Sequence, residues 1–233
     1  MTSRGAPHRR LPAGPLLRWA AFAVVVVVQL TALWWDNEPI SVPAQSLLMP
    51  VLALPALLAR PGWLRAWTLI ALFFSFLGDT LPRFVPENVL FLSMLGSFFV
   101  AHLAWIVGLW RVRPPRPWLL IPYLAVGVSV VAWCWPGAGA LAPALVAYAA
   151  AMLTTTLLAL GLGWPGVVGG ALFIVSDALI AARTFADFTF PQSDVVVMAT
   201  YAISHGLLVL GVTRSPGHRE GLAYSRSRGW HAP

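Results

Sequence analysis

Long apolar stretches separated by short polar breaks dominate this sequence. A helix that crosses the hydrocarbon core of a membrane needs about 17–25 apolar residues. Eight stretches reach or approach that length, and the breaks between them are rich in proline, glycine, asparagine and aspartate, which favour turns. The pattern therefore predicts eight transmembrane helices. Their expected limits are 16–35, 42–59, 64–82, 88–110, 117–135, 139–160, 164–183 and 193–213.

Proline positions refine two of these helices. The second stretch is the shortest and contains Pro43, Pro50 and Pro55, so we expect it to be kinked or partly interfacial. The fifth stretch is expected to end at Pro136-Gly137, because this pair is typical of a turn.

Composition supports a membrane protein. Of the 233 residues, 59% are hydrophobic and 10% are charged, whereas a soluble domain has about 25% charged residues. We therefore expect an all-α, polytopic transmembrane helix bundle over 16–213. The predicted cytoplasmic tails are 1–15 and 214–233, the second of them disordered. The single cysteine, Cys134, excludes a disulfide within the chain.

Arginine positions predict the orientation. All 15 basic side chains are arginine, and cytoplasmic loops carry an excess of positive charge. With the N-terminus inside, only Arg83 and Arg183 fall in outer segments, which leaves 13 of the 15 on the inner side. Both termini are thus expected in the cytoplasm. Because the arginines lie in short loops, they indicate orientation and not nucleic-acid binding, and arginine in place of lysine suggests a bacterial inner membrane.

Two aspartates, Asp79 and Asp177, lie inside apolar stretches. A carboxylate at membrane depth costs roughly 3 kcal/mol on insertion scales, so a chain retains one only where it is paired, protonated or used. Each is followed on the next predicted helix by a histidine, His102 or His205. This recurrence suggests two parallel four-helix repeats.

Helix geometry predicts how these groups meet. Counting residues from the helix ends places both aspartates in the outer part of the membrane and both histidines near its middle. We expect all four to line one cavity that opens to the outer side. Ser75, one turn before Asp79, and Ser176, next to Asp177, are expected to hydrogen-bond a carboxylate.

The outer arginines and the possible metal ligands allow alternatives. Arg83 and Arg183 either hold a phosphate headgroup or snorkel at helix ends. Two histidines and two aspartates suit zinc in number, but the sequence has no HExxH motif or cysteine cluster. It also lacks a glycine-rich phosphate loop and a GxSxG nucleophile motif. We therefore predict a site without a cofactor or a metal.

Several motifs, in this order, resemble those of the lysoplasmalogenase family of membrane proteins, also called YhhN-like. The similarity extends from about residue 45 to 212 and includes patterns similar to the family's FSxxGDxxL, GxxxFxxAHxxY and GAxLFxxSDxxL. The stretches that carry it are Leu47-Leu48-Met49-Pro50, Phe74-Ser75-Phe76-Leu77-Gly78-Asp79-Thr80-Leu81, Gly96-Ser97-Phe98-Phe99-Val100-Ala101-His102-Leu103-Ala104-Trp105, Gly170-Ala171-Leu172-Phe173-Ile174-Val175-Ser176-Asp177-Ala178-Leu179 and Tyr201-Ala202-Ile203-Ser204-His205.

The resemblance implies hydrolysis of the vinyl ether bond of lysoplasmalogens, which yields a fatty aldehyde and a glycerophospho-ethanolamine or -choline. The partners expected are a lysophospholipid substrate and membrane lipids. In that reaction a protonated carboxyl supplies a proton to carbon, and an ionised one stabilises the oxocarbenium-like cation, as in glycosidases. We assign Asp177 as the acid, Asp79 as stabiliser or base and His102 as the group that orients a carboxyl or the water. The reverse assignment of the aspartates stays open.

The chain departs from the family pattern at two positions. It has Gln45-Ser46 where the family often has Lys-Pro, and Trp105 in place of tyrosine. Headgroup preference is therefore open. The candidate substrate-binding residues are Ser75, Ser176, His205, Arg83, Arg183 and Gln45.

Two other functional classes fit the same residues. A transporter or lipid-binding protein would use the aspartates and histidines to relay protons or hold a substrate. A zinc amidase-like lipid hydrolase would usually need three histidines. The sequence leaves the oligomeric state open.

Overall fold

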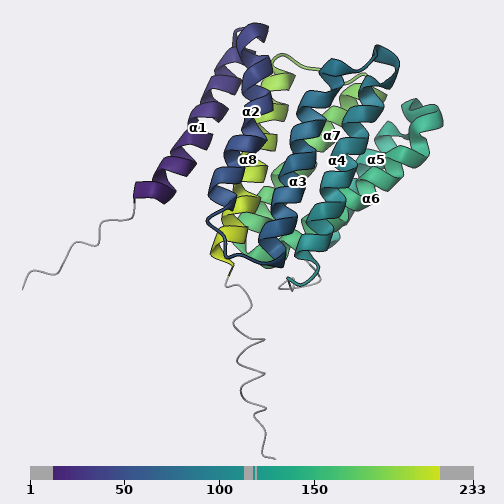
Figure 1. Ribbon diagram of the computed structural model, residues 1–233. Helices are drawn as coiled ribbons and strands as arrows, with labels where there is room; N and C mark the ends of the chain where they lie inside the picture. The colour runs from purple at the N-terminus through teal and green to yellow at the C-terminus, as the bar shows by residue number, and fades with distance from the viewer. Residues whose placement is uncertain (1–12, 113–117, 119, 216–233) are drawn as a thin grey trace, which may run out of the picture.

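The computed structural model describes residues 13–112, 118 and 120–215, and these residues form an all-α bundle (Figure 1). The predicted tails, 1–15 and 214–233, lie almost wholly outside the described residues. Short 3-10 helices follow α3, α5 and α6. The long helices are α1 (Ala13–Trp34), α2 (Glu38–Ala56), α3 (Trp63–Thr80), α4 (Glu87–Leu109), α5 (Leu120–Ala138), α6 (Ala142–Ala159), α7 (Trp164–Phe185) and α8 (Ser193–Arg214).

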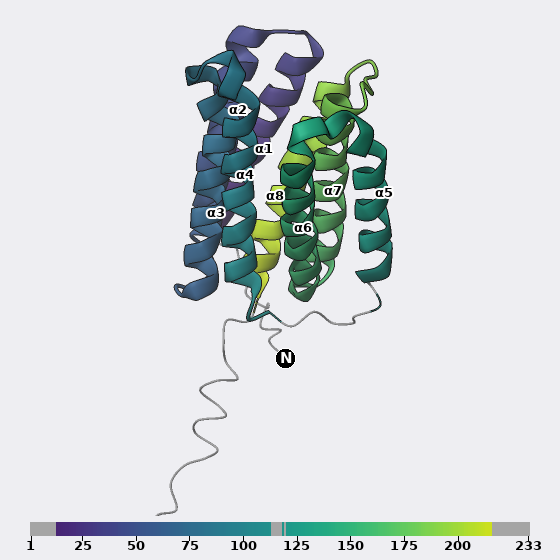
Figure 2. The same ribbon diagram turned by 90° about the vertical axis from the view of Figure 1, so that its right-hand side faces the viewer.

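The eight helices run alternately up and down, so α1 begins and α8 ends at the same end of the bundle (Figures 1 and 2). Helix α8 lies at the centre, where it contacts α1, α2, α3 and α7. Helices α5, α6 and α7 form a second group whose members all contact one another, and α7 also packs extensively on α8. Figure 2 shows this group beside α4, and α6 makes its main backbone approach to α4.

The chain is a multi-pass membrane protein. Seven segments of the described residues are long and apolar enough to cross a membrane, and the longest of them, Ile121–Leu162, includes both α5 and α6. The chain reverses inside that segment, because α5 and α6 pack side by side (Figure 2). The count of eight membrane crossings, like the internal repeat, stays a prediction.

Two predicted helix limits near prolines were wrong. Pro136 lies inside α5, and the chain reverses one helical turn later at Gly139, whose φ of 47° suits glycine. Helix α2 begins at Glu38, before the expected residue 42, and has proline in its first turn. Proline is tolerated there because its missing N–H would have no partner within the helix.

Close packing along α7 sets the orientation of Asp177. A Cβ atom at Gly170 would lie 2.7 Å from Cγ2 of Thr156, so α7 and α6 approach closely at this point. Residues seven apart on a helix share a face. Asp177, seven residues after Gly170, therefore faces α6, and Tyr148 on the antiparallel α6 lies two turns before Thr156 and meets it.

The neighbouring face of α7 packs on α8 in the same register. Ser204 Oγ donates to the backbone oxygen of Gly169 at 2.8 Å, and Ser176 Oγ donates to that of Val197 at 3.1 Å. The two bonding positions on α7, Gly169 and Ser176, are seven residues apart, and so are the two on α8, Val197 and Ser204. Adjacent residues such as Ser176 and Asp177 thus point toward different helices.

Candidate functional site

Asp177 is held by side chains from two other helices. Tyr148 Oη on α6 donates a hydrogen bond of 2.9 Å to Asp177 Oδ2. His102 Nε2 on α4 lies 3.5 Å from the same oxygen. His102 is 1% exposed and the Asp177 side chain 9%, so the carboxyl is largely shielded yet keeps some open surface.

The hydrogen bonds of His102 indicate its tautomer. Thr155 Oγ1 donates to the backbone oxygen of His102 at 3.2 Å, and this bond uses the single hydrogen of the Thr155 hydroxyl. His102 Nδ1 also lies 3.2 Å from Thr155 Oγ1 and must therefore be the donor in that pair. Nε2 is then the ring nitrogen that faces Asp177, and a single proton between Nε2 and the carboxyl oxygen would link the two side chains.

Asp79 accepts hydrogen bonds at both carboxyl oxygens. Gln45 Nε2 donates to Oδ1 at 3.2 Å, and Tyr201 Oη donates to Oδ2 at 2.8 Å. Arg83 Nη2 donates to Gln45 Oε1 at 2.7 Å, which orients the amide so that its nitrogen faces Asp79. Two donors stabilise the ionised form of a carboxyl, whereas burial favours the neutral form, so these hydrogen bonds offset only part of the cost of burying Asp79.

His205 lies beside Asp79 but does not bond to it. Its Nδ1 lies 3.1 Å from the backbone oxygen of Tyr201, which accepts, so Nε2 accepts from Ser75 Oγ at 3.4 Å. Both ring nitrogens are occupied and the side chain is fully buried. Ser75 therefore bonds to a histidine and not to Asp79, and the expectation that it bonds to a carboxylate was wrong.

Rings connect the two carboxyl groups. His102 lies 5.2 Å from Tyr148 and 4.9 Å from Phe173, measured between ring centroids. On the other side of Phe173 lie His205 at 4.7 Å and then Tyr201, 4.4 Å from His205. Asp177 and Asp79 thus lie at opposite ends of a row of five neighbouring rings, which contact one another edge-on or at a tilt.

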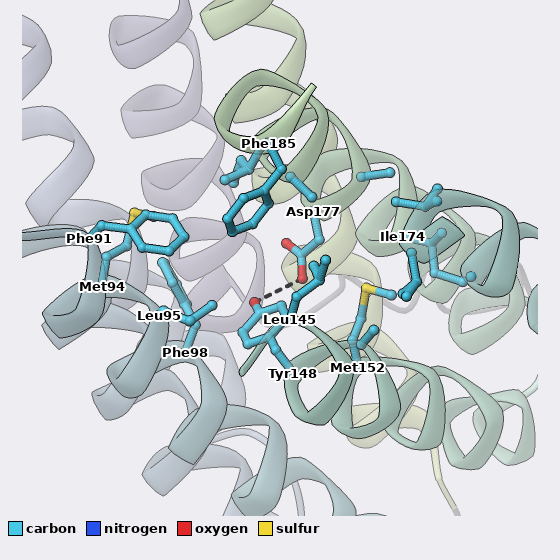
Figure 3. A pocket seen from close by; sticks show the side chains of 17 residues that line it. Phe91, Met94, Leu95, Phe98, Leu145, Tyr148, Met152, Ile174, Asp177 and Phe185 are labelled. Atoms are coloured by element: carbon cyan, nitrogen blue, oxygen red, sulfur yellow. Dashed lines mark hydrogen bonds between the residues drawn. The ribbon is translucent and has the colours of Figure 1, made fainter. Parts of the chain in front are cut away.

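A cavity of about 710 Å³, including its open mouth, lies between α4 and the group α5, α6 and α7. Figure 3 shows Asp177 among its lining side chains, with the hydrogen bond from Tyr148. Asp79, His102 and His205 are not among the lining residues. Of the four predicted groups, Asp177 is thus the one that lines this cavity.

Phe98 separates this cavity from Asp79. It lines the cavity, and its ring lies edge-on to Tyr201 with the centroids 5.8 Å apart. A Cβ atom at Gly78 would lie 2.9 Å from the Phe98 ring. The ring therefore fills the space next to Asp79 that the prediction assigned to a shared cavity.

The remaining predicted residues have other partners. Ser176 donates to the backbone of α8, so its predicted bond to a carboxylate was wrong. Arg183, exposed near the end of α7, pairs with Asp194. Among the described residues, no group of three or more histidine, cysteine, aspartate or glutamate side chains is placed to hold a metal ion.

Sequence reasoning missed Tyr148 and Tyr201, which donate to the two aspartates. A usable signal was present: tyrosine is scarce in this chain, with four residues. A buried phenol normally finds a hydrogen-bond partner, and a carboxylate is the strongest acceptor within a membrane span.

Comparison with known proteins identifies the family of this chain. The profile of the YhhN family matches residues 40–212, which contain both aspartates, both histidines and both tyrosines. The chain belongs to the YhhN family. No solved structure matches it significantly.

Curated relatives of this YhhN protein cover most of the chain. It is 33% identical over 228 residues to lysoplasmalogenase TMEM86B of Rattus norvegicus, covering 89% of this chain and 92% of that protein. It is 32% identical over 186 residues to the Sus scrofa protein of the same name, covering 78% and 80%. The Mus musculus protein of that name is 29% identical over 208 residues, covering 86% and 88%.

Proposed function

We propose that this protein is a lysoplasmalogenase, a membrane hydrolase that cleaves the vinyl ether bond of lysoplasmalogens. The products would be a fatty aldehyde and a glycerophospho-ethanolamine or -choline. The likeness to three curated lysoplasmalogenases over most of the chain supports the reaction. One observation links the reaction to a particular residue: the carboxyl group of Asp177 lies at the wall of an apolar cavity inside the helix bundle.

In the proposed mechanism, Asp177 donates its proton to the β-carbon of the vinyl ether, which is the alkene carbon not bonded to oxygen. The electron pair of the double bond forms the new C–H bond, and the carbon attached to oxygen becomes an oxocarbenium-like cation. Water adds to that carbon and loses a proton. The hemiacetal then breaks at the bond between this carbon and the glycerol oxygen, which takes up a proton, and the aldehyde leaves.

The surroundings of the two aspartates support different roles for them. Asp177 lines the cavity and lies beside His102 Nε2, so it is the carboxyl that can reach a substrate there. Asp79 accepts two hydrogen bonds and does not line the cavity. We therefore assign Asp177 as the acid and Asp79 as the stabiliser or base, whose charge would act from outside the cavity. His205 and Ser75 would hold Tyr201 in place.

For the headgroup we propose Arg83 and Gln45. Arg83 is exposed at the end of the bundle where α3 ends, and a guanidinium has five N–H donors, of which Gln45 occupies one. A phosphate bound by the others would lie within reach of the Gln45 and Asp79 group. Arg183, at the same end, would add positive charge, although Asp194 already pairs with it.

The test is turnover by the purified protein. Wild-type protein in detergent is mixed with a lysoplasmalogen, and aldehyde release is measured with and without a chelator. We expect release in both cases. No release of aldehyde from either an ethanolamine or a choline substrate would contradict the proposed function. Turnover in detergent, where there is no second compartment, would also exclude obligatory transport.

A further inference from the structure

The cavity beside Asp177 extends well beyond the carboxyl group. Its lining residues run from Phe91 to Phe98 on α4, from Leu145 to Met152 on α6 and from Ile174 to Phe185 on α7, which is two to three helical turns on each helix. The described residues that line it come from four helices, and only Asp177 and Tyr148 among them carry polar side-chain atoms apart from sulfur. The rest of the wall is apolar.

These walls define the class of ligand. A polar group placed in the cavity away from Asp177 would lose its water without gaining a hydrogen bond, which costs several kcal/mol. An apolar chain gains from the same burial. The cavity thus suits a hydrocarbon chain that carries one reactive group at the end near Asp177.

Aromatic rings cover the outer end of this cavity. Phe91, in the second turn of α4, meets Phe185, the last residue of α7, edge to face with the ring centroids 5.7 Å apart (Figure 3). Both side chains line the cavity. A chain that came from the aqueous end would have to separate this pair.

A second opening lies at the side of the bundle. A groove of about 560 Å³, including open space, runs between α4 and α6, and all its lining residues are apolar except Tyr148. Leu95 and Tyr148 line both the groove and the cavity, so these two side chains form the partition between them. Gly96 and Ala147, in the groove, are exposed. The groove therefore faces the surrounding lipid.

We infer that the hydrocarbon chain of the substrate enters sideways from the membrane through the groove between α4 and α6, passes between Leu95 and Tyr148 and occupies the cavity. The alkenyl carbons lie at Asp177 and the saturated part of the chain lies among the apolar walls. The inference rests on the proposed function for the identity of the reacting group. The occupant is one unbranched lipid chain, because such chains surround the groove and the polar side chains among the described lining residues, Asp177 and Tyr148, lie together at one place in the wall.

The first test is chain-length preference. Ala149 is buried and lines the cavity, whereas its neighbour Ala150 is exposed. Ala149→Leu should lower kcat/KM for a long-chain lysoplasmalogen by about 10-fold or more relative to a short-chain one, because room for single methylene groups is worth about that factor. Ala150→Leu should leave the ratio unchanged. An unchanged ratio in Ala149→Leu, or an equal loss with both substrates, would overturn the cavity assignment.

The second test concerns access. A Cβ atom at Gly96 would meet nothing within 4 Å, so Gly96→Trp should fill the groove without disturbing the packing. It should lower kcat/KM for a long-chain substrate in vesicles and leave kcat at saturation unchanged. The control is Leu103→Trp, at an exposed position two turns further along α4. Equal kcat/KM values for the two tryptophan variants would exclude access through this groove.

A binding measurement separates this inference from the proposed function. The probe is a lysophospholipid with a saturated ether chain, which cannot be hydrolysed, and a photoreactive diazirine on that chain. Irradiation should label peptides of α4 and α6 that contain Met94 and Met152, which line the cavity, and Ala149→Leu should reduce this labelling. If these peptides are labelled but the protein releases no aldehyde, the proposed hydrolase function is refuted and the cavity assignment stands. If aldehyde is released but only other helices are labelled, the cavity assignment is refuted and the hydrolase function stands.

Discussion

His102 Nε2 on α4 lies 3.5 Å from Asp177 Oδ2 on α7. This contact joins the two helix groups of the bundle, because α4 packs on α3 while α7 packs on α5, α6 and α8. The catalytic carboxyl proposed here thus depends on how α4 sits against α6 and α7. Substitution of either residue should lower activity more than it lowers the stability of the fold.

Asp177→Asn and Asp79→Asn should each lower kcat by at least roughly 100-fold, as expected when an acid–base group is lost. Asparagine keeps the shape and removes the titratable group, so both variants should fold. Aldehyde release and size-exclusion chromatography check this, with Asp187→Asn, at an exposed carboxylate, as control. Near-normal turnover in either variant would assign that aspartate to a structural role.

His102→Ala should lower kcat nearly as much as the loss of Asp177, because its Nε2 faces that carboxyl. His205→Ala should have a milder effect on kcat, since both nitrogens of His205 bond to groups other than the carboxylates. The two variants are compared for kcat and for thermal unfolding. A larger loss of kcat in His205→Ala would reverse the roles proposed for the two histidines.

Tyr148→Phe should lower kcat by about 10- to 100-fold, because Asp177 becomes a carboxylate as it gives up its proton and a hydrogen bond to a charged group is worth about 1.5–3 kcal/mol. The reason is the loss of the donor to Asp177. Tyr123→Phe serves as the matched control, because Tyr123 donates to the backbone oxygen of Val167. If Tyr148→Phe turned over at the rate of Tyr123→Phe, the hydroxyl would have no part in the reaction.

Cysteine labelling in intact cells should report the orientation. In a Cys134→Ala background, cysteine at Asn37 or Ser193 should react with an impermeant reagent added outside, and cysteine at Pro61 should not. The first two positions lie at the end of the bundle opposite to the start of α1, and Pro61 lies at the same end as that start (Figure 1). The reverse labelling pattern would place the arginine-rich end outside.

Turnover in oxygen-18 water should leave the glycerophospho product unlabelled. Water attacks the alkenyl carbon in the proposed mechanism, so the glycerol hydroxyl keeps its original oxygen. Aldehydes exchange oxygen with water, and mass spectrometry of the glycerol product is therefore the measurement to use. Oxygen-18 in that hydroxyl would mean cleavage on the other side of the ether oxygen.

The sequence by itself determined the helices and the most informative polar groups. Length and composition decide whether an apolar stretch is long enough to cross a membrane, because the hydrocarbon core has a fixed thickness. Asp79 and Asp177 stood out for the same reason, since a carboxylate inside such a stretch is costly. Both are largely buried in side-chain hydrogen-bond networks.

Only the tertiary structure decided which side chains meet. Ser176 and Asp177 are neighbours in sequence, yet one bonds to α8 and the other to a tyrosine of α6, because successive residues on a helix point about 100° apart. Contacts such as Tyr201 with Asp79 depend on the rotation and register of packed helices. Close approach at positions such as Gly170 fixes that register, and no local pattern in the sequence encodes it.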